Sequence, residues 1–260
     1  MRGNHVKAAL AAGGASIGTM VFEFNSTGIG RIASEAGAEF VIFDMEHTGW
    51  SIETIRMLIA TTRAAETIPM VRVPATQYHL LSRPLDVGAM GLMVPMVEDA
   101  EQAQLIVRSS KYFPEGGRGA AFGVAHDDYR GGEVSATMAS ANAEGMLIAQ
   151  IETVKGVENA EAIAATPGID CLWIGHFDLT QSLRIPAQFD DPRFQQAVDR
   201  VLAACASQGK AAGIMAGSVD VGKEWLRRGF RAVAYSGDLW IYQQALAQGL
   251  KELRSTAARP

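Results

Sequence analysis

The sequence predicts a single (β/α)8 barrel, an α/β fold of eight parallel strands alternating with helices. Its length of 260 residues is close to the about 250 residues typical of such barrels. Short apolar runs rich in Val, Ile and Met alternate with segments of helical periodicity, as in sheets joined by crossover helices. Runs such as VIFD, GLMVP, MLIAQ and CLWIG are apolar almost throughout, which is typical of strands buried on both faces.

Eight such runs predict the strands of the barrel. In chain order they cover residues 17–22, 40–43, 68–71, 91–94, 146–150, 171–174, 212–215 and 232–235. Between them, residues 52–66, 98–110 and 191–209 carry apolar side chains at helical spacing. The last two of these segments open with acidic residues suited to a helix N-terminus, and Gly209 is predicted as a C-cap.

The segment 112–132 is too rich in Gly and polar residues to form a helix. A loop of this length inside a compact domain usually has a function. Its GGRG motif at 116–119 could bind an anion through backbone amides or act as a lid. We interpret His126 with the two aspartates that follow it as a solvated turn. No linker or internal repeat interrupts the chain, so residues 1–260 are predicted to form one barrel domain.

Composition excludes several classes of protein. Hydrophobic residues make up 48% and charged residues 20% of the chain, as in ordinary globular domains. A formal net charge of -5 gives no basic field for nucleic acid, so no nucleic-acid partner is expected. No apolar run approaches the about 18 to 20 residues of a membrane span, and glycines interrupt the N-terminal apolar segment. We therefore expect a cytoplasmic protein without a membrane partner, in which Cys171 and Cys205 are core thiols.

Active sites of these barrels form at the carboxyl ends of the strands. Polar residues follow four of the predicted strands: Asp44, Glu46 and His47 after the second, Arg72 after the third, Gln150 and Glu152 after the fifth, and Gly175, His176 and Asp178 after the sixth. The fourth strand ends only in Pro95. These strand ends are therefore the candidate site.

Glu152 and Asp178 supply two carboxylates from neighbouring strands. Oxygen ligands of this kind suit a hard cation such as Mg2+ or Mn2+ that keeps other positions for water or substrate. Two alternatives stay open at this point. Each carboxylate could instead cap a helix N-terminus, or the pair could act as a metal-free acid and base, although the aromatic content of 7% is low for a sugar-binding barrel.

Arg72 and His47 are the candidate electrophile and base. A fixed arginine at a strand end could stabilise a developing oxyanion, or it could form a structural ion pair with Asp44 or Glu46. The His47 imidazole could exchange protons near neutral pH, with Asp44 orienting it, or it could be a non-catalytic histidine.

The ordered set of motifs resembles the HpcH/HpaI aldolase family, the class II pyruvate-type aldolases, within the phosphoenolpyruvate/pyruvate barrel superfamily. The resemblance runs nearly end to end. It is carried by the segments FDMEHTGW, VRVP, LDVGAMGLMVPMVEDAEQA, FPEGGRG, AQIETVKGVENAEAIAATPGID, WIGHFDLTQSLRIP, GKAAGIMA and GFRAVAYSGD.

The resemblance implies a role for each candidate residue. Glu152 and Asp178 match the ligands of a divalent metal cation, Mg2+, Mn2+ or Co2+. Arg72 matches the arginine that stabilises the enolate. His47 matches the catalytic base, and Asp44 lies beside it in the family's dyad.

Further roles concern the substrate and the assembly. Gln150 matches a polar group near bound pyruvate, and the backbone amides at Gly175, His176, Phe177 and Asp178 match the site of its carboxylate. Asp86 matches a carboxylate that reaches the site across a subunit boundary. The family implies a hexamer, a trimer of dimers, in which the C-terminal helix within residues 238–253 is exchanged between subunits.

Two departures from the family pattern bear on the aldehyde partner. His176 stands where the family commonly has Pro, and Thr48, Gly49 and Trp50 replace Ala-Pro-Asn. We expect His176 and Trp50 to bind substrate.

The resemblance implies a carbon–carbon lyase that reversibly cleaves a 4-hydroxy-2-oxo acid to pyruvate, or a related 2-keto acid, and an aldehyde through a metal-bound enolate. No Lys ends a candidate strand, in agreement with a mechanism without a Schiff base. The alternatives are a lyase acting on a coenzyme A thioester, a non-catalytic binding protein and an NAD-dependent oxidoreductase. The last rests on Gly28, Gly30 and Ala33, which spell GxGxxA. Against it, residues 25–27 intervene after the strand and suggest a helix N-cap.

Overall fold

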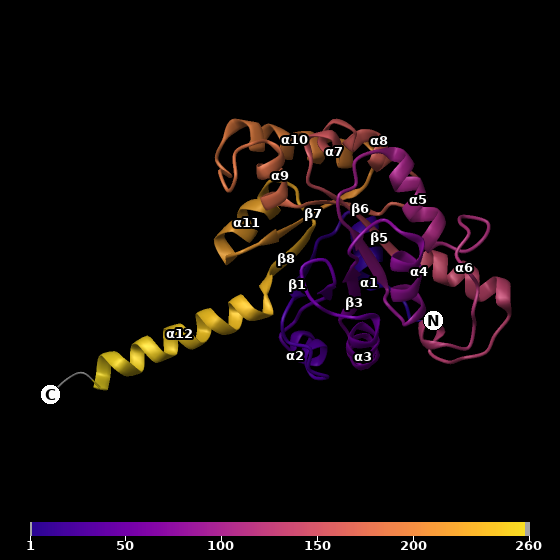
Figure 1. The fold of residues 1–260 in the computed structure, drawn as a ribbon, viewed down its shortest axis with the longest axis horizontal. Helices are drawn as coiled ribbons and strands as arrows, with labels where there is room; N and C mark the ends of the chain where they lie inside the picture. Colours follow the sequence, from indigo (N-terminus) through magenta and orange to yellow (C-terminus); the bar gives the residue numbers. More distant parts are fainter. Residues whose placement is uncertain (1, 258–260) are drawn as a thin grey trace.

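The computed structural model describes residues 2–257 and shows parallel strands closed into one barrel, in the order β1 to β8 (Figure 1). The predicted (β/α)8 fold class is confirmed. Every predicted strand overlaps an observed one, and their ends differ by at most two residues. The strands are β1 (Ser16–Val21), β2 (Phe40–Asp44), β3 (Ile68–Arg72), β4 (Gly91–Val94), β5 (Met146–Ile151), β6 (Cys171–Ile174), β7 (Ala211–Ala216) and β8 (Ala232–Gly237).

Helices surround the barrel and include the three predicted from periodicity, α3, α5 and α10. Asp99 and Asp191 are the N-caps of α5 and α10, and each side chain accepts an amide hydrogen bond. Gly209 follows α10 with a φ of 65°, a conformation that favours glycine. The helices are α1 (His5–Ala11), α2 (Ile29–Glu35), α3 (Ile52–Thr62), α4 (Tyr78–Asp86), α5 (Ala100–Ser110), α6 (Val134–Glu144), α7 (Val154–Glu158), α8 (Ala160–Ala165), α9 (His176–Ser182), α10 (Pro192–Ser207), α11 (Val219–Arg227) and α12 (Asp238–Ala257).

Alternation along the strands divides the core into two layers. Val41 and Phe43 of β2 belong to the larger cluster between strands and helices. Phe40 and Ile42 of the same strand belong to a separate cluster that Met20, Met70 and Trp173 share inside the barrel. The next inward position after Ile42 is the end of the strand, so the interior packing leads directly up to the candidate site.

The GxGxxA segment serves helix packing. A Cβ on Gly30 would lie 1.9 Å from Oγ1 of Thr62, so this glycine allows α2 to approach α3. The N-cap of α2 is Gly28, without a side-chain cap, so the predicted capping by residues 25–27 is wrong. The closed barrel also differs from the open sheet that binds dinucleotides.

The segment 112–132 contains no α-helix, as predicted, and only the 3-10 turn η1 (Ala125–Asp127). The predicted solvated turn is wrong, because His126 and Asp127 are buried at 1% and 4% exposure. The loop folds back so that the His126 ring faces Tyr112 and contacts the Ala121 carbonyl at 2.7 Å. Local polarity alone did not reveal this folding back.

Helix α12 leaves the barrel and projects away from it (Figure 1). Asp238 is its only buried residue, and it exposes six large hydrophobic side chains: Trp240, Ile241, Tyr242, Leu246, Leu250 and Leu253. Exchange of this helix between subunits stays a prediction. None of the helices in residues 2–257 has the length and apolar character needed to span a membrane.

Candidate active site

Strand register brings the polar strand ends together inside the barrel mouth. Asp44 and Arg72 are direct partners in the β2–β3 pairing. Both continue the inward-facing rows that begin with Phe40 and Ile68 deeper in the barrel. Gln150 continues the same row on β5 and is 2% exposed. Because side chains alternate along a strand, these polar groups face the interior as a consequence of the apolar pattern before them.

Arg72 is fixed by two carboxylates and an aromatic ring. Its Nε lies 2.6 Å from Asp44 Oδ1, and its Nη1 lies 3.1 Å from Glu46 Oε2. The guanidinium also stands over the Phe22 ring, 5.8 Å from the centroid. The ion-pair interpretation of Arg72 is therefore confirmed. The same contacts hold its guanidinium in one position at the cavity, which an oxyanion role requires, and that role stays a prediction.

Glu46 is part of the site, although sequence reasoning gave it only the role of an ion-pair partner. Burial raises its pKa to about 7, and the Arg72 cation opposes this shift. The nearby carboxylates of Asp44 and Asp178 raise the pKa further. Its buried Oε2 pairs with Arg72 Nη1 at 3.1 Å and lies 3.7 Å from His47 Nε2. Glu46 therefore connects the Arg72 cation with the His47 ring.

Glu152 is a buried carboxylate held from both sides. Its Oε1 accepts a hydrogen bond from the Met96 amide at 2.7 Å, and its Oε2 accepts one from Gln150 Nε2 at 2.6 Å. Burial raises its pKa to about 7, against the effect of these two hydrogen bonds. Thr153, not Glu152, caps α7, so the capping alternative is wrong for this residue.

Asp178 lies in the first turn of α9 but does not cap that helix. Gly175 is the N-cap, and no side-chain oxygen accepts a capping hydrogen bond there. The Asp178 carboxylate instead accepts a hydrogen bond from Gln181 Nε2 at 3.2 Å. It is close enough to Glu152 to raise the pKa of that residue. The two predicted ligands therefore face one space.

His176 and Phe177 line the same cavity from the start of α9. Burial lowers the pKa of His176 to about 4, and the Asp178 carboxylate opposes this shift. The His176 imidazole is therefore neutral near pH 7. Its ring lies 4.6 Å from the Phe177 ring and 5.4 Å from Phe189, so it belongs to an aromatic wall.

His47 lines the cavity, but Asp44 does not contact its imidazole. Asp44 Oδ2 accepts a hydrogen bond from the His47 backbone amide at 3.0 Å. The ring Nε2 lies 3.7 Å from Glu46 Oε2, and the side chain is 57% exposed. The expectation that Asp44 polarises the ring is therefore wrong, because that carboxylate is occupied by Arg72 and by two backbone amides.

Two predicted site residues lie away from this cavity. Trp50 packs against the cluster between strands and helices. Asp86 ends α4 and pairs with Arg118 at 2.6 Å. Neither residue lines the cavity at the strand ends, and the contribution of Asp86 from another subunit stays a prediction.

Apart from Asp44, which is buried behind Arg72 and paired with it, the remaining predicted residues line a cavity of about 270 Å³. Met20, Phe22 and Trp173 contribute apolar surface that the polar pattern did not reveal. A backbone feature was also missed, because the Met96 amide that binds Glu152 has no signature in the residue types. The lining comprises Met20, Phe22, His47, Arg72, Gln150, Glu152, Trp173, Ile174, Gly175, His176, Phe177, Asp178, Met215 and Trp240.

The donor set fits a divalent cation bound with few protein ligands. In residues 2–257 no group of three or more His, Cys, Asp or Glu side chains is arranged to hold a metal. Glu152 and Asp178 nevertheless line one cavity, and the charges of Asp178 and of nearby Glu46 both raise the pKa of Glu152. Mutual repulsion of buried carboxylates is relieved by a cation. A site of two carboxylates completed by water and substrate matches this arrangement.

Comparison with known proteins identifies the family. The family model described as HpcH/HpaI aldolase/citrate lyase matches residues 18–245. The chain belongs to this family. It is 36% identical over 261 residues to a 4-hydroxy-2-oxovalerate aldolase from Novosphingobium aromaticivorans, covering 98% of the chain and 96% of that protein. It is 33% identical over 257 residues to a 2-keto-3-deoxy-L-rhamnonate aldolase from Klebsiella pneumoniae, covering 99% and 96%.

The solved structures agree. An HpcH/HpaI aldolase from Desulfitobacterium hafniense superposes with a TM-score of 0.91 at 31% identity, covering 98% of this chain and 97% of that one. The curated relatives that are 32 to 36% identical to this chain are named aldolases, so it is a carbon–carbon lyase of the aldolase type. Dependence on a divalent metal is general in the family.

Proposed function

We propose that the chain reversibly cleaves a 4-hydroxy-2-oxo acid to pyruvate, or a related 2-keto acid, and an aldehyde. The observation that carries the proposal is the convergence of Arg72, Gln150 and two carboxylates in one cavity of about 270 Å³. That space suits a small keto acid. Relatives named 4-hydroxy-2-oxovalerate aldolase and 2-keto-3-deoxy-L-rhamnonate aldolase support the same reaction class.

Glu152 and Asp178 would hold a divalent cation such as Mg2+, Mn2+ or Co2+. When bound, the cation supplies Lewis acidity to the keto oxygen of the substrate. The Met96 amide and Gln150 keep the Glu152 carboxylate oriented toward the cavity. Gln150 also lines the cavity and stands within reach of bound pyruvate.

Arg72 stabilises the negative charge of the enolate formed when the C3–C4 bond breaks. Its guanidinium is fixed by Asp44 and Glu46 before substrate arrives, so no reorganisation is needed during the reaction. The substrate carboxylate binds the backbone amides at the first turn of α9, which no side chain caps.

His47 accepts the proton of the C4 hydroxyl. Its ring is exposed toward the cavity and lies beside Glu46. The carboxylate that assists His47 is therefore Glu46, since Asp44 is engaged by Arg72. Protonation of C3 of the enolate, by the proton now held on His47 or by a proton from solvent, forms the methyl group of pyruvate and completes the cleavage.

We also propose that the chain works as an oligomer, a hexamer built as a trimer of dimers, in which α12 packs on another copy. The support is that α12 extends from the barrel with its large apolar side chains exposed. In such an assembly the Asp86 of one subunit would reach the site of the next. Removal of residues 238–260 should reduce the number of subunits per particle, which light scattering gives as the particle mass divided by the mass of one chain. An unchanged number of subunits would contradict the exchange.

Deuterium exchange at the methyl group of pyruvate, followed by NMR, tests the enolate chemistry directly. Exchange should require Mg2+, Mn2+ or Co2+ and should stop with EDTA. Glu152→Gln should lower the exchange rate by at least about 100-fold, whereas Glu161→Gln, an exposed carboxylate on α8, should not. Exchange that persists in EDTA or in Glu152→Gln would contradict the metal-dependent proposal.

The proton transfer is tested by His47→Ala. Loss of an acid–base group should lower the rate of aldol cleavage by about 100- to 10,000-fold. Full cleavage activity in this variant would remove His47 from the mechanism.

A further inference from the structure

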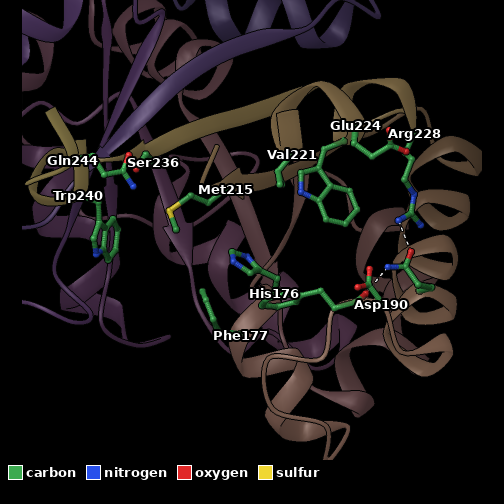
Figure 2. Close-up of a pocket in the computed structure, with 14 residues that line it drawn as sticks. His176, Phe177, Asp190, Met215, Val221, Glu224, Arg228, Ser236, Trp240 and Gln244 are labelled. Carbon is green, nitrogen blue, oxygen red and sulfur yellow. Dashed lines mark hydrogen bonds between the residues drawn. The ribbon is translucent and has the colours of Figure 1, made fainter. Parts of the chain in front are cut away.

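A second cavity, of about 840 Å³, adjoins the candidate active site (Figure 2). The two cavities share four lining residues: His176, Phe177, Met215 and Trp240. From Met215 and Trp240 the larger cavity extends past Val221 toward Glu224 and Arg228 (Figure 2). Its volume falls in the range of about 300 to 1,000 Å³ of small-molecule sites.

Both cavities have charged and apolar walls. Arg72, Glu152 and Asp178 line the smaller one, and Asp190, Glu224 and Arg228 lie at the far end of the larger one (Figure 2). Near the shared residues, apolar side chains make most of the wall of the larger cavity: Phe177, Phe189, Met215, Val221, Trp225 and Trp240. The wall is formed before any ligand binds. The Phe189 ring packs against Phe177 at 5.3 Å and against Phe194 at 5.6 Å between centroids.

The arginine at the far end is already paired. Arg228 donates to Gln195 Oε1 at 2.6 Å and to Asp199 Oδ1 at 2.7 Å. Its guanidinium also covers the Trp225 ring at 5.1 Å. Within residues 2–257, Arg228 is the only Lys or Arg that lines this cavity. The cavity therefore offers no free cation to a phosphate group or a nucleotide.

An aldol reaction joins two molecules, and the chain presents two adjoining cavities, of which the larger has an apolar wall next to the active site. We propose that the larger cavity holds the group attached to the carbonyl carbon of the aldehyde, and that the preferred aldehyde is apolar or aromatic and not polyhydroxylated. This inference rests on the proposed function. Burial of one methylene group contributes about fourfold to kcat/KM when burial is complete.

Condensation of pyruvate with a graded series of aldehydes tests the inference. The probes are acetaldehyde, butanal, hexanal, 3-phenylpropanal and a pentose in its aldehyde form. The value of kcat/KM should rise with chain length, by up to about fourfold per methylene, and should be at least tenfold higher for hexanal than for the pentose, a ratio that the apolar wall predicts. A flat series, or preference for the pentose, overturns the inference.

Methyl exchange of pyruvate without an aldehyde distinguishes failure of the proposed function from failure of the inferred aldehyde preference. Wild-type protein without exchange would overturn the proposed function and this inference together. Exchange with a flat aldehyde series would overturn only this inference.

Two valines on α11 provide matched variants. Val221 lines the cavity, whereas Val219 does not, and they are 44% and 55% exposed. Val221→Trp should lower the ratio of kcat/KM for hexanal to that for acetaldehyde by about tenfold or more, and Val219→Trp should leave this ratio unchanged. Val221→Lys gives a second test, because a charge inside the apolar wall should also lower the ratio. An unchanged ratio in both Val221 variants overturns the inference. If, in addition, the molar mass of the assembly changes in these variants, another copy of the chain fills the cavity.

Discussion

Gly175 stands where β6 ends, directly against the carboxylate of Glu152. A Cβ at this position would lie 2.2 Å from Glu152 Oε2 and 2.8 Å from its Cβ. Glu152 cannot simply rotate away, because the Met96 amide and Gln150 Nε2 hold its two oxygens and the side chain is 2% exposed. The substitution Gly175→Ala therefore displaces the carboxylate by about an ångström.

The cost of this displacement follows from the bond that is lost. Moving Oε2 away from the new methyl group breaks the hydrogen bond from Gln150. A hydrogen bond to a charged group contributes about 1.5 to 3 kcal/mol, which corresponds to about 10- to 100-fold in rate or affinity. We expect the rate of pyruvate methyl exchange to fall by this factor in Gly175→Ala. The concentration of Mg2+ or Mn2+ giving half the maximal rate should rise.

The assay is methyl exchange by NMR at a series of metal concentrations, with circular dichroism to confirm folding. Gly131→Ala is the control, because a Cβ there has no neighbour within 4 Å. A folded Gly175→Ala variant with wild-type rate and wild-type metal requirement would show that the Glu152 position is not important for the reaction.

Three further predictions concern the fixed cation, a buried lysine and the core. Arg72→Lys should lower methyl exchange by about 100-fold, because a lysine lacks the planar fork of donors that Asp44 and Glu46 hold in one position. A rate near that of the wild type would contradict the enolate role. Burial lowers the pKa of Lys111 from 10.5 to about 8. Between pH 8 and pH 10 the unfolded chain therefore binds a proton that the folded chain has lost. The free energy of unfolding should rise over this range by up to about 1.4 kcal/mol per pH unit. Urea denaturation of Lys111→Met should lack that increment, and an equal slope in both proteins would contradict the assignment. Phe194→Ala should lower the free energy of unfolding in urea by about 3 to 5 kcal/mol, since the ring is fully buried. A loss below about 1 kcal/mol would mean that neighbouring side chains fill the space left by the ring.

The part of the site that lies on strands could be predicted because side chains alternate between the two faces of a strand. Asp44, Arg72 and Gln150 each end an apolar run, and alternation places them on the inward row. Each also lies on a strand whose ends were predicted to within two residues. The parts that were missed do not depend on such a rule. The amide of Met96, a non-glycine residue with a φ of 55°, binds Glu152 through backbone geometry that no residue type announces.

Misjudged features share a physical cause. The Asp44 carboxylate turned to Arg72 and to backbone amides, and away from the His47 ring. His126 became buried because the loop folded back over Tyr112. In each case several partners of similar chemistry were available, and only packing selected among them.

The sequence by itself determined the barrel and the order of its strands. It also placed the site at the carboxyl ends of the strands, with Glu152 and Asp178 together there. These follow from periodicity and from the alternation of side chains, which act over a few residues. The tertiary structure alone decided which groups meet. Closure of the barrel buried Glu152 fully and Glu46 in part, and this burial raised the pKa of each to about 7. It also placed a large cavity directly beside the small one that holds the candidate site. Desolvation, coupling of charges and cavity shape depend on distances between strands far apart in the chain.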